Sequence, residues 1–175
     1  MDSTYTNNTT YYIKKQSLAL PVKITAEDVD FIPVYKTEGA ACLDCKADIL
    51  SLDKTRPYLV EDTLTIPPGN IEVIDLGFRV QVPEGYVMNL YIRSGLAAKK
   101  GLIMVNGTGK IDSDYRGIVK AIIGNISTKV VEIKHKDRIA QCEIVPVTPV
   151  CFQQVSSLEE TDRGEGGLGS TGTNG

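Results

Sequence analysis

Ile71-Glu-Val-Ile-Asp-Leu-Gly-Phe-Arg-Val-Gln-Val82 is the clearest strand signal in this chain. Its second half alternates apolar and polar residues, a pattern typical of a strand with one buried face. Other short runs share its β-branched texture. These runs are predicted to be strands: Tyr86–Ile92, Ile118–Ile123, Val130–Ile133 and Ala140–Val147.

Turn signals separate these runs at Pro67-Pro-Gly69, Pro83-Glu-Gly85 and Lys136-Asp137. Several short strands at this spacing predict an all-β barrel or sandwich. The segment Ser94-Gly-Leu-Ala-Ala-Lys-Lys-Gly101 departs from the pattern. It has a serine suited to capping, good helix formers, late cations and a closing glycine, so it predicts one short helix.

Composition limits the classes of function. The chain has 175 residues and a formal charge of −3, which fits one domain with a real core and gives no electrostatic reason to expect nucleic-acid or membrane partners. No apolar run approaches the ~20 residues of a membrane span. Residues 1–12 are polar and lack an apolar signal core. We expect a soluble, cytoplasmic protein.

The four cysteines are Cys42, Cys45, Cys142 and Cys151. The C-x-x-C spacing of the first two raises zinc or redox chemistry as a possibility. A structural zinc needs four ligands, and the only histidine, His135, is distant in the sequence. Four reduced, mostly buried thiols are the simpler interpretation.

Composition also divides the chain into three parts. Residues 1–17 form a polar extension, residues 18–155 are predicted to form the all-β core, and residues 156–175 form a glycine-rich tail. From Arg163 to Gly175 the tail holds six glycines in thirteen residues. It is either a disordered segment or a flap whose Arg163, Ser170, Thr171 and main-chain amides close over an anion.

Gly107-Thr-Gly-Lys-Ile-Asp-Ser-Asp-Tyr-Arg-Gly117 is the stretch in which we expect the chemistry. It places three glycines, two carboxylates, a tyrosine and two cations between two apolar runs. Glycines permit close approach of a ligand to the main chain. A carboxylate and an aromatic ring on such a turn can contact a small polar ligand from two sides.

Five segments, in order, resemble the five motifs of the trimeric dUTP pyrophosphatase (dUTPase) family. They are Ala41-Cys-Leu-Asp-Cys-Lys-Ala47, Arg93-Ser-Gly-Leu96, Asn106-Gly-Thr-Gly-Lys-Ile-Asp-Ser-Asp-Tyr-Arg-Gly117, Arg138-Ile-Ala-Gln141 and Arg163-Gly-Glu-Gly-Gly-Leu-Gly-Ser-Thr-Gly172. The resemblance implies a homotrimer of distorted jelly-roll subunits whose active sites each collect residues from three chains. It also implies hydrolysis of dUTP to dUMP and pyrophosphate, with Mg²⁺ held by the substrate triphosphate.

By the same resemblance, Asp112 orients and deprotonates the attacking water, as an acceptor-only carboxylate can. Main-chain groups of the hairpin read the uracil edge, and Tyr115 packs under deoxyribose and excludes a ribose hydroxyl. The positions matching the uracil-reading hairpin are Asn106, Gly109, Lys110, Ile111 and Lys120. Without the other motifs, Asp112 and Asp114 would be ordinary turn acids and Tyr115 a strand-end core residue.

Further residues match positions that bind the phosphates. Arg93, Ser94 and Gly95 match a phosphate-binding helix start. Gln141 matches a side chain that binds phosphate or the catalytic water, and Asp44 matches an acid that supports the phosphate and magnesium-water region. Alone, Gln141 would be a solvated strand residue and Asp44 a structural acid. In the tail, Arg163, Leu168, Gly169, Ser170 and Thr171 match the segment that closes over the substrate. We expect no protein ligand in the first shell of the metal, because Mg²⁺ keeps its waters and the triphosphate supplies oxygens.

The sequence departs from the family pattern at three places. Leu168 replaces the usual phenylalanine that stacks on uracil, and such stacking is worth ~1–3 kcal/mol in related settings. Leu168 can cover the base but not stack on it, so we expect weaker capture with the chemistry retained. Ile92 replaces the usual proline before Arg93, while Cys42 and Leu43 replace small or aromatic residues of the first motif.

Two alternative functions are weighed against this one. A dCTP deaminase shares the fold but uses a glutamate on the strand after the hairpin, and residues 118–125 contain no carboxylate. A non-catalytic trimer that serves as a binding or regulatory module is favoured only by Leu168. The retained Asp112, Arg93 and Gln141 argue against it.

Overall fold

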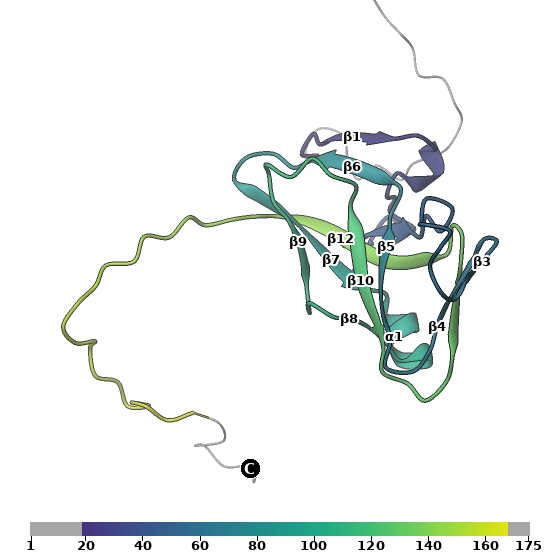
Figure 1. The fold of residues 1–175 in the computed structure, drawn as a ribbon. Coiled ribbons are helices and arrows are strands. Elements are labelled where there is room, and N and C mark those ends of the chain that lie inside the picture. Colours follow the sequence, from purple (N-terminus) through teal and green to yellow (C-terminus); the bar gives the residue numbers. More distant parts are fainter. Residues whose placement is uncertain (1–18, 168–175) are drawn as a thin grey trace, which may run out of the picture.

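The computed structural model describes residues 19–167. Within this range the chain is built of short strands and a single α-helix (Figure 1). Its elements are β1 (Lys23–Ala26), the 3₁₀ turn η2 (Val29–Phe31), β2 (Leu43–Lys46), β3 (Leu59–Val60), β4 (Thr63–Ile66), β5 (Ile71–Asp75), β6 (Phe78–Gln81), β7 (Tyr86–Ile92), α1 (Ser94–Lys100), β8 (Leu102–Met104), β9 (Gly109–Ile111), β10 (Lys120–Asn125), β11 (Val131–Lys134) and β12 (Arg138–Pro146).

Across residues 19–167 the strands form four antiparallel sheets with the orders β1-β6, β5-β10-β8, β11-β4-β3 and β2-β12-β7-β9. The predicted all-β class with one short helix is therefore confirmed. Because β12 pairs with both β2 and β7, it brings the first and fourth motif segments into adjacent strands.

The inward side chains of all four sheets form one apolar cluster. Burying large aliphatic and aromatic side chains is the main source of stability in a domain of this size. The largest fully buried members are Phe78, Ile49, Leu64, Ile66, Ile74, Leu76, Leu90, Leu102, Ile123, Ile133, Ile139 and Val82.

The predicted strand over residues 71–82 is two strands, so this prediction was wrong in its extent. Gly77 separates β5 from β6 and has a φ of 75°, a left-handed conformation that glycine adopts at little cost. A Cβ atom at Gly77 would also overlap the ring of Phe31. The break sends β5 to pair with β10 and β6 to pair with β1.

The predicted helix is present, but its capping differs from the prediction. Ser94 is the first helical residue rather than the cap. The N-cap is Arg93, which makes no side-chain capping bond. Gly101 ends the helix as predicted, with a φ of 65°. A Cβ there would lie 2.7 Å from Cβ of Ser127, so glycine is required for close packing as well as for conformation.

β7 has the predicted bounds, Tyr86–Ile92, and the other predicted strands are present with shifted ends. The run predicted at 118–123 forms β10 at Lys120–Asn125, and the run predicted at 130–133 forms β11 at Val131–Lys134. The run predicted at 140–147 forms β12 at Arg138–Pro146.

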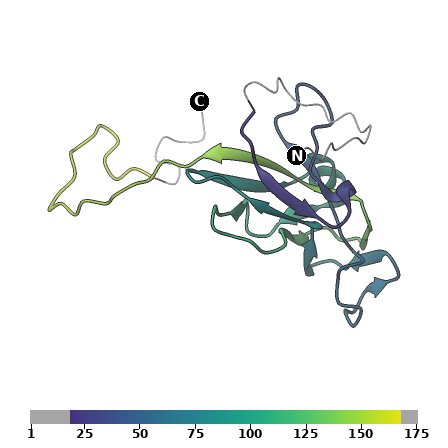
Figure 2. The ribbon, with the colours of Figure 1, turned by 90° about the horizontal axis from the view of Figure 1, so that it is seen from above.

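Beyond β12 the chain leaves the sheets as an extended arm. Figures 1 and 2 show residues 147–167 running away from the body in both views. Several apolar side chains of the arm are exposed, including Phe152 at 95% and Leu158 at 87%. The extension predicted at residues 1–17 lies outside the described residues.

Candidate active site

The turn between β8 and β9 lies between two sheets. β8 pairs with β10, whereas β9 pairs with β7. Gly107 in this turn has a φ of 70°, and its N–H donates to the Met104 carbonyl over 2.9 Å. Asn106, at the same turn, is exposed.

β9 and β10, the strands before and after the turn that carries Asp112, pair with different partners. Gly109 of β9 packs so closely on Leu90 that an added Cβ would lie 3.1 Å from Cβ of Leu90. β8 reaches only Ile123 to Asn125 of β10. Among the described strands, Lys120 therefore has a partner on one side only, in β5. This arrangement leaves main-chain groups available to a flat ligand between the strands.

Asp112 follows β9 directly and is exposed. Its carbonyl accepts a hydrogen bond from the Tyr115 N–H over 3.2 Å, which closes the turn that carries Asp114. Among the described residues, no hydrogen bond or ion pair occupies the Asp112 carboxylate. An ionised carboxylate in that state can accept a hydrogen bond from water.

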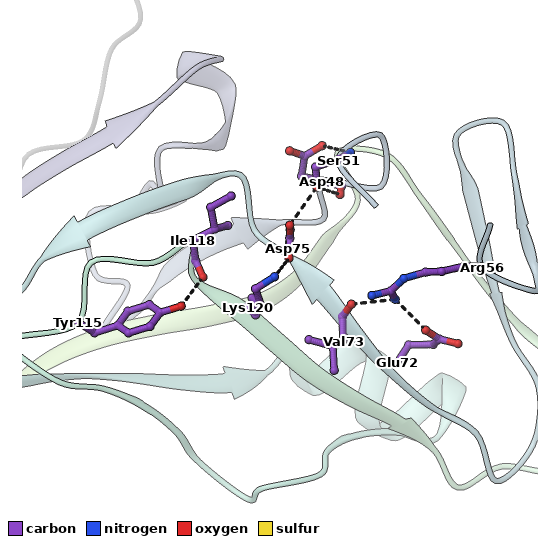
Figure 3. Close-up of polar contacts among 9 residues, drawn as sticks. All are labelled: Asp48, Ser51, Arg56, Glu72, Val73, Asp75, Tyr115, Ile118 and Lys120. Atoms are coloured by element: carbon purple, nitrogen blue, oxygen red, sulfur yellow. Dashed lines mark hydrogen bonds and ion pairs between the residues drawn. The ribbon is translucent and has the colours of Figure 1, made fainter. Parts of the chain in front are cut away.

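Tyr115 is held rigidly by its own loop (Figure 3). Its hydroxyl donates to the Ile118 carbonyl over 2.9 Å, and its ring occupies the space where a Cβ of Gly117 would be. Arg116 donates to the Ser113 and Tyr115 carbonyls over 2.7 Å each. The Tyr115 side chain is 39% exposed, so part of a fixed ring remains open to a ligand.

Lys110 and Lys120 both have polar partners for their side chains. Lys110 Nζ donates to Asn89 Oδ1 over 3.1 Å, and Asn89 lies on β7. Lys120 Nζ donates to Asp75 Oδ1 over 2.8 Å. The prediction for these positions concerns their main chain, and Ile111, the last residue of β9, is half-buried. We call Asn106, Gly109, Lys110, Ile111, Asp112, Tyr115 and Lys120 the hairpin group.

A second set of predicted residues meets at the end of the β2-β12-β7 sheet. The Asp44 carboxylate, 12% exposed, forms ion pairs with Arg138 NH1 at 2.8 Å and Arg93 Nε at 3.3 Å. Arg93 NH1 also donates to the Arg138 carbonyl over 3.1 Å. Gln141 lies opposite Asp44 on one side and Tyr91 on the other. Asp44 therefore orients two cations.

The start of α1 adjoins these residues. The amides of Leu96 and Ala97 both donate to the Arg93 carbonyl, while the first amides of a helix, here those of Ser94 and Gly95, have no intrahelical acceptor. Both residues are exposed, and no atom lies within 4 Å of a Cβ built at Gly95. We call Asp44, Arg93, Ser94, Gly95, Arg138 and Gln141 the arginine group.

Sequence reasoning assigned no role to Arg138, although the motif containing it was recognised. Its contact with Asp44 makes it part of the arginine group. Tyr91, which lies opposite Gln141 in the sheet, was also not predicted as a site residue. Its hydroxyl donates to Glu143 Oε1 over 2.7 Å, and this hydrogen bond raises the pKa of Tyr91. No motif signal pointed to Tyr91.

No hydrogen bond or ion pair between described residues joins the two groups, and none joins Arg163 to either of them. Arg163 lies in the arm, where its Nε donates to the Gly166 carbonyl over 2.9 Å. Leu168, Gly169, Ser170 and Thr171 lie outside the described residues.

All four cysteines are free thiols. Cys45 and Cys142 are buried, and a hydrogen bond with Cys142, together with burial, raises the pKa of Cys45 well above its ordinary value. Over residues 19–167, no group of three or more His, Cys, Asp and Glu side chains could hold a metal ion. Within the same residues, no helix is long and apolar enough to cross a membrane.

The sequence model of the dUTPase family matches residues 58–172 of this chain. The chain belongs to the dUTPase family. It is 41% identical over 141 residues to the deoxyuridine 5'-triphosphate nucleotidohydrolase of Roseobacter denitrificans, covering 81% of this chain and 86% of that one.

The fold agrees with solved dUTPase structures. Staphylococcus bacteriophage 80alpha dUTPase with dUPNHPP is 25% identical and has a TM-score of 0.71, covering 88% of this chain and 99% of that chain. The dUTPase of phage phi11 of S. aureus, a mutant that coordinates a structural Mg(II) ion, is 23% identical with a TM-score of 0.65, covering 81% and 100%. The jelly-roll fold implied by the motifs is thereby confirmed for this dUTPase.

Proposed function

We propose that this protein hydrolyses dUTP to dUMP and pyrophosphate and so keeps uracil out of DNA. The observation that carries the proposal is the Asp112 carboxylate, which has no hydrogen bond or ion pair among the described residues, followed along the chain by Lys120, whose main chain has a described strand partner on its β5 side only. Membership of the dUTPase family supports this reaction, and the main chain of the hairpin group would recognise the base. Uracil presents a carbonyl where cytosine presents an amino group, and fixed main-chain donors and acceptors distinguish the two steeply.

In the proposed reaction Asp112 accepts a proton from a water molecule whose oxygen forms a bond to the α-phosphorus. The bond from that phosphorus to the bridging oxygen breaks, and pyrophosphate leaves. Arg93, the Ser94 and Gly95 amides and Gln141 stabilise charge on the phosphate oxygens. Asp44 and Arg138 hold Arg93 in place, as their ion pairs and hydrogen bonds indicate.

We further propose that Mg²⁺ arrives with the triphosphate, which supplies oxygens while the ion keeps several waters. The carboxylates of the described site fit this role: Asp112 is free to hold a water, whereas Asp44 is occupied by two arginines. The ion neutralises phosphate charge when bound.

We propose a homotrimer as the active assembly. No hydrogen bond or ion pair between described residues joins the hairpin group, the arginine group and Arg163 within one chain, and assembly would bring them together. Exposed apolar surface supports the proposal, because monomers rarely leave contiguous apolar patches open. Ile71 and Val73 of β5 are 56% and 37% exposed, and the arm exposes Val150, Phe152, Val155 and Leu158.

The tail at residues 156–175 is proposed to close over the substrate of a neighbouring subunit. Arg163 would pair with phosphate, while Gly169, Ser170 and Thr171 would donate to it. Leu168 would cover the base without stacking. The polar extension, the core boundary at residue 155 and a cytoplasmic location stay predictions.

A comparison of dUTP, dCTP, dTTP and UTP as substrates tests the function. We expect pyrophosphate release from dUTP only, because dCTP has the wrong edge, dTTP carries a 5-methyl group and UTP carries a 2′-hydroxyl. Ammonia release from dCTP would favour the deaminase. Absence of turnover with every nucleotide would favour the non-catalytic trimer and contradict the proposal.

A further inference from the structure

Asp75 is the one buried acidic residue among the described side chains, with 8% of its surface exposed. It lies at the end of β5, directly opposite Lys120 of β10. Its Oδ1 accepts a hydrogen bond from Lys120 Nζ at 2.8 Å, and its Oδ2 accepts one from Ser51 Oγ at 3.2 Å (Figure 3). Both carboxylate oxygens are thus engaged.

Asp75 joins three segments of the chain. Its carbonyl accepts a hydrogen bond from the Asp48 N–H over 2.8 Å. The turn from Asp48 to Ser51 therefore contacts both the main chain and the side chain of Asp75. Lys120 adds the third segment, β10, which follows the turn that begins at Asp112. A buried carboxylate is stable only with such partners, and losing one is costly.

The segment tied by Asp75 is the one that carries the proposed pyrimidine contacts. Ile118, two residues before Lys120, accepts the Tyr115 hydroxyl bond, and the Val119 carbonyl accepts a hydrogen bond from the Leu76 N–H over 2.9 Å. Residues 118–120 are therefore fixed from the β5 side, while the opposite edge of Lys120 has no strand partner in the described chain.

We propose that Asp75, assisted by Ser51, is a positioning residue for pyrimidine recognition. It holds the Lys120 ammonium toward β5, which keeps the side chain away from the pyrimidine and fixes the Lys120 main chain at the distance that the uracil edge requires. This inference rests on the proposed function, because it assumes that Lys120 contacts the base. The inference predicts that KM for dUTP depends on Asp75, although Asp75 does not contact the substrate.

Steady-state kinetics of Asp75→Asn, Lys120→Met and the double variant test the inference. We expect each single variant to raise KM for dUTP about tenfold with kcat within about twofold, since misplaced positioning groups weaken capture. We expect the preference for dUTP over dCTP in binding to fall in parallel. The double variant should show no larger rise in KM than the worse single variant, because the two residues act as one unit.

Glu72→Gln is the matched control. Glu72 also lies on β5 and forms an ion pair at 3.1 Å with Arg56, from the same connection as Ser51, but this pair contacts neither Lys120 nor residues 118–119 (Figure 3). KM and base preference should be unchanged in this control. Lys120 is 48% exposed, so Lys120→Met is the variant to measure if Asp75→Asn does not fold.

Unchanged KM and base preference in folded Lys120→Met or Asp75→Asn would overturn the inference. Losses confined to kcat and melting temperature, or losses equal to those of Glu72→Gln, would do the same, since they indicate a structural role only. The proposed function fails separately: it is wrong if the unmodified protein does not turn over dUTP. Active unmodified protein with unaffected variants would overturn the positioning role alone.

Discussion

At the scale of single residues, the molecule combines free and fully engaged polar groups. The Asp112 carboxylate has no hydrogen bond or ion pair within residues 19–167, whereas Asn125 is 1% exposed and uses its whole amide. Asn125 Nδ2 donates to the Ile66 and Lys129 carbonyls over 2.8 Å each, and Oδ1 accepts from Ser127. The Asp112 carboxylate is suited to chemistry, and the Asn125 amide holds the end of β10 to β4.

Replacing Asn125 by alanine should lower the free energy of unfolding by ~2–4 kcal/mol, because several buried polar groups lose their partner. Urea unfolding at matched protein concentration measures this change, since assembly makes stability depend on concentration. Asn70→Ala serves as the control and should change stability by less than about 0.5 kcal/mol. Equal effects of the two variants would refute this role of Asn125.

Individual residues also show what the sequence could and could not predict. Asp112 and Tyr115 could be predicted as site residues because they lie in a dense local motif. Asp75 was not predicted as a positioning residue, because the alternation of the strand does not show whether an acid is buried. Its place between Ile74 and Leu76 was the one signal that it could be buried. The partner that explains it, Lys120, is 45 residues away.

At the scale of elements, turns and short strands were harder to predict than long ones. β9 (Gly109–Ile111) is three residues with a glycine and a lysine, and it exists because β7 pairs with it. Propensity carries no such information. Gly77 ended a strand that looked continuous, because its role depends on Phe31 from a distant segment. β7 and α1, with strong local patterns, were predicted to within a residue.

One pH-dependent contact joins the 3₁₀ turn η2 to the connection between β11 and β12. Lys136 Nζ pairs with Asp28 at 2.6 Å and Asp30 at 2.9 Å. Hydrogen bonding to Lys136 lowers the pKa of both carboxyl groups below their ordinary value of 3.8. A lowered folded-state pKa stabilises the protein above the unfolded-state value, and this stabilisation disappears as pH falls through the folded-state pKa.

We therefore expect Lys136→Met to lower the melting temperature slightly at pH 7 and to match the unmodified protein once pH falls below the lowered pKa values of Asp28 and Asp30. Exposure to solvent keeps the effect small. Melting curves across pH 2–7 measure the difference. A difference that grows on acidification would have the wrong sign and would contradict this assignment.

At the scale of the whole molecule, we propose that the site is completed only when copies of the chain assemble. No hydrogen bond or ion pair between described residues joins the hairpin group, the arginine group and Arg163, and the arm extends from the body with exposed apolar side chains (Figures 1 and 2). The motifs predict a set of site residues, and their roles stay predictions. The motifs could not predict which of these residues meet, because that depends on strand pairing and on assembly between copies.

Two inactive variants should restore activity to each other if the site is shared between chains. Chains carrying Asp112→Asn lack the base, and chains lacking residues 164–175 keep Asp112 but lack the tail. Each alone should fold and lose at least about 100-fold in turnover. Mixed, unfolded and refolded together, they should recover dUTP hydrolysis. No recovery in verified mixed assemblies would show that tail and base come from one chain.

Hydrolysis of dUTP in ¹⁸O-labelled water by the unmodified protein and by Asp112→Asn tests the central claim most directly, because the label reports which phosphorus the water attacks and the rate of the variant reports whether Asp112 activates that water. We predict one ¹⁸O atom in the phosphate of dUMP and none in pyrophosphate. We also predict that Asp112→Asn slows the reaction by about 10²–10⁴-fold with KM little changed. Label in pyrophosphate, or equal rates for the two proteins, would contradict the account.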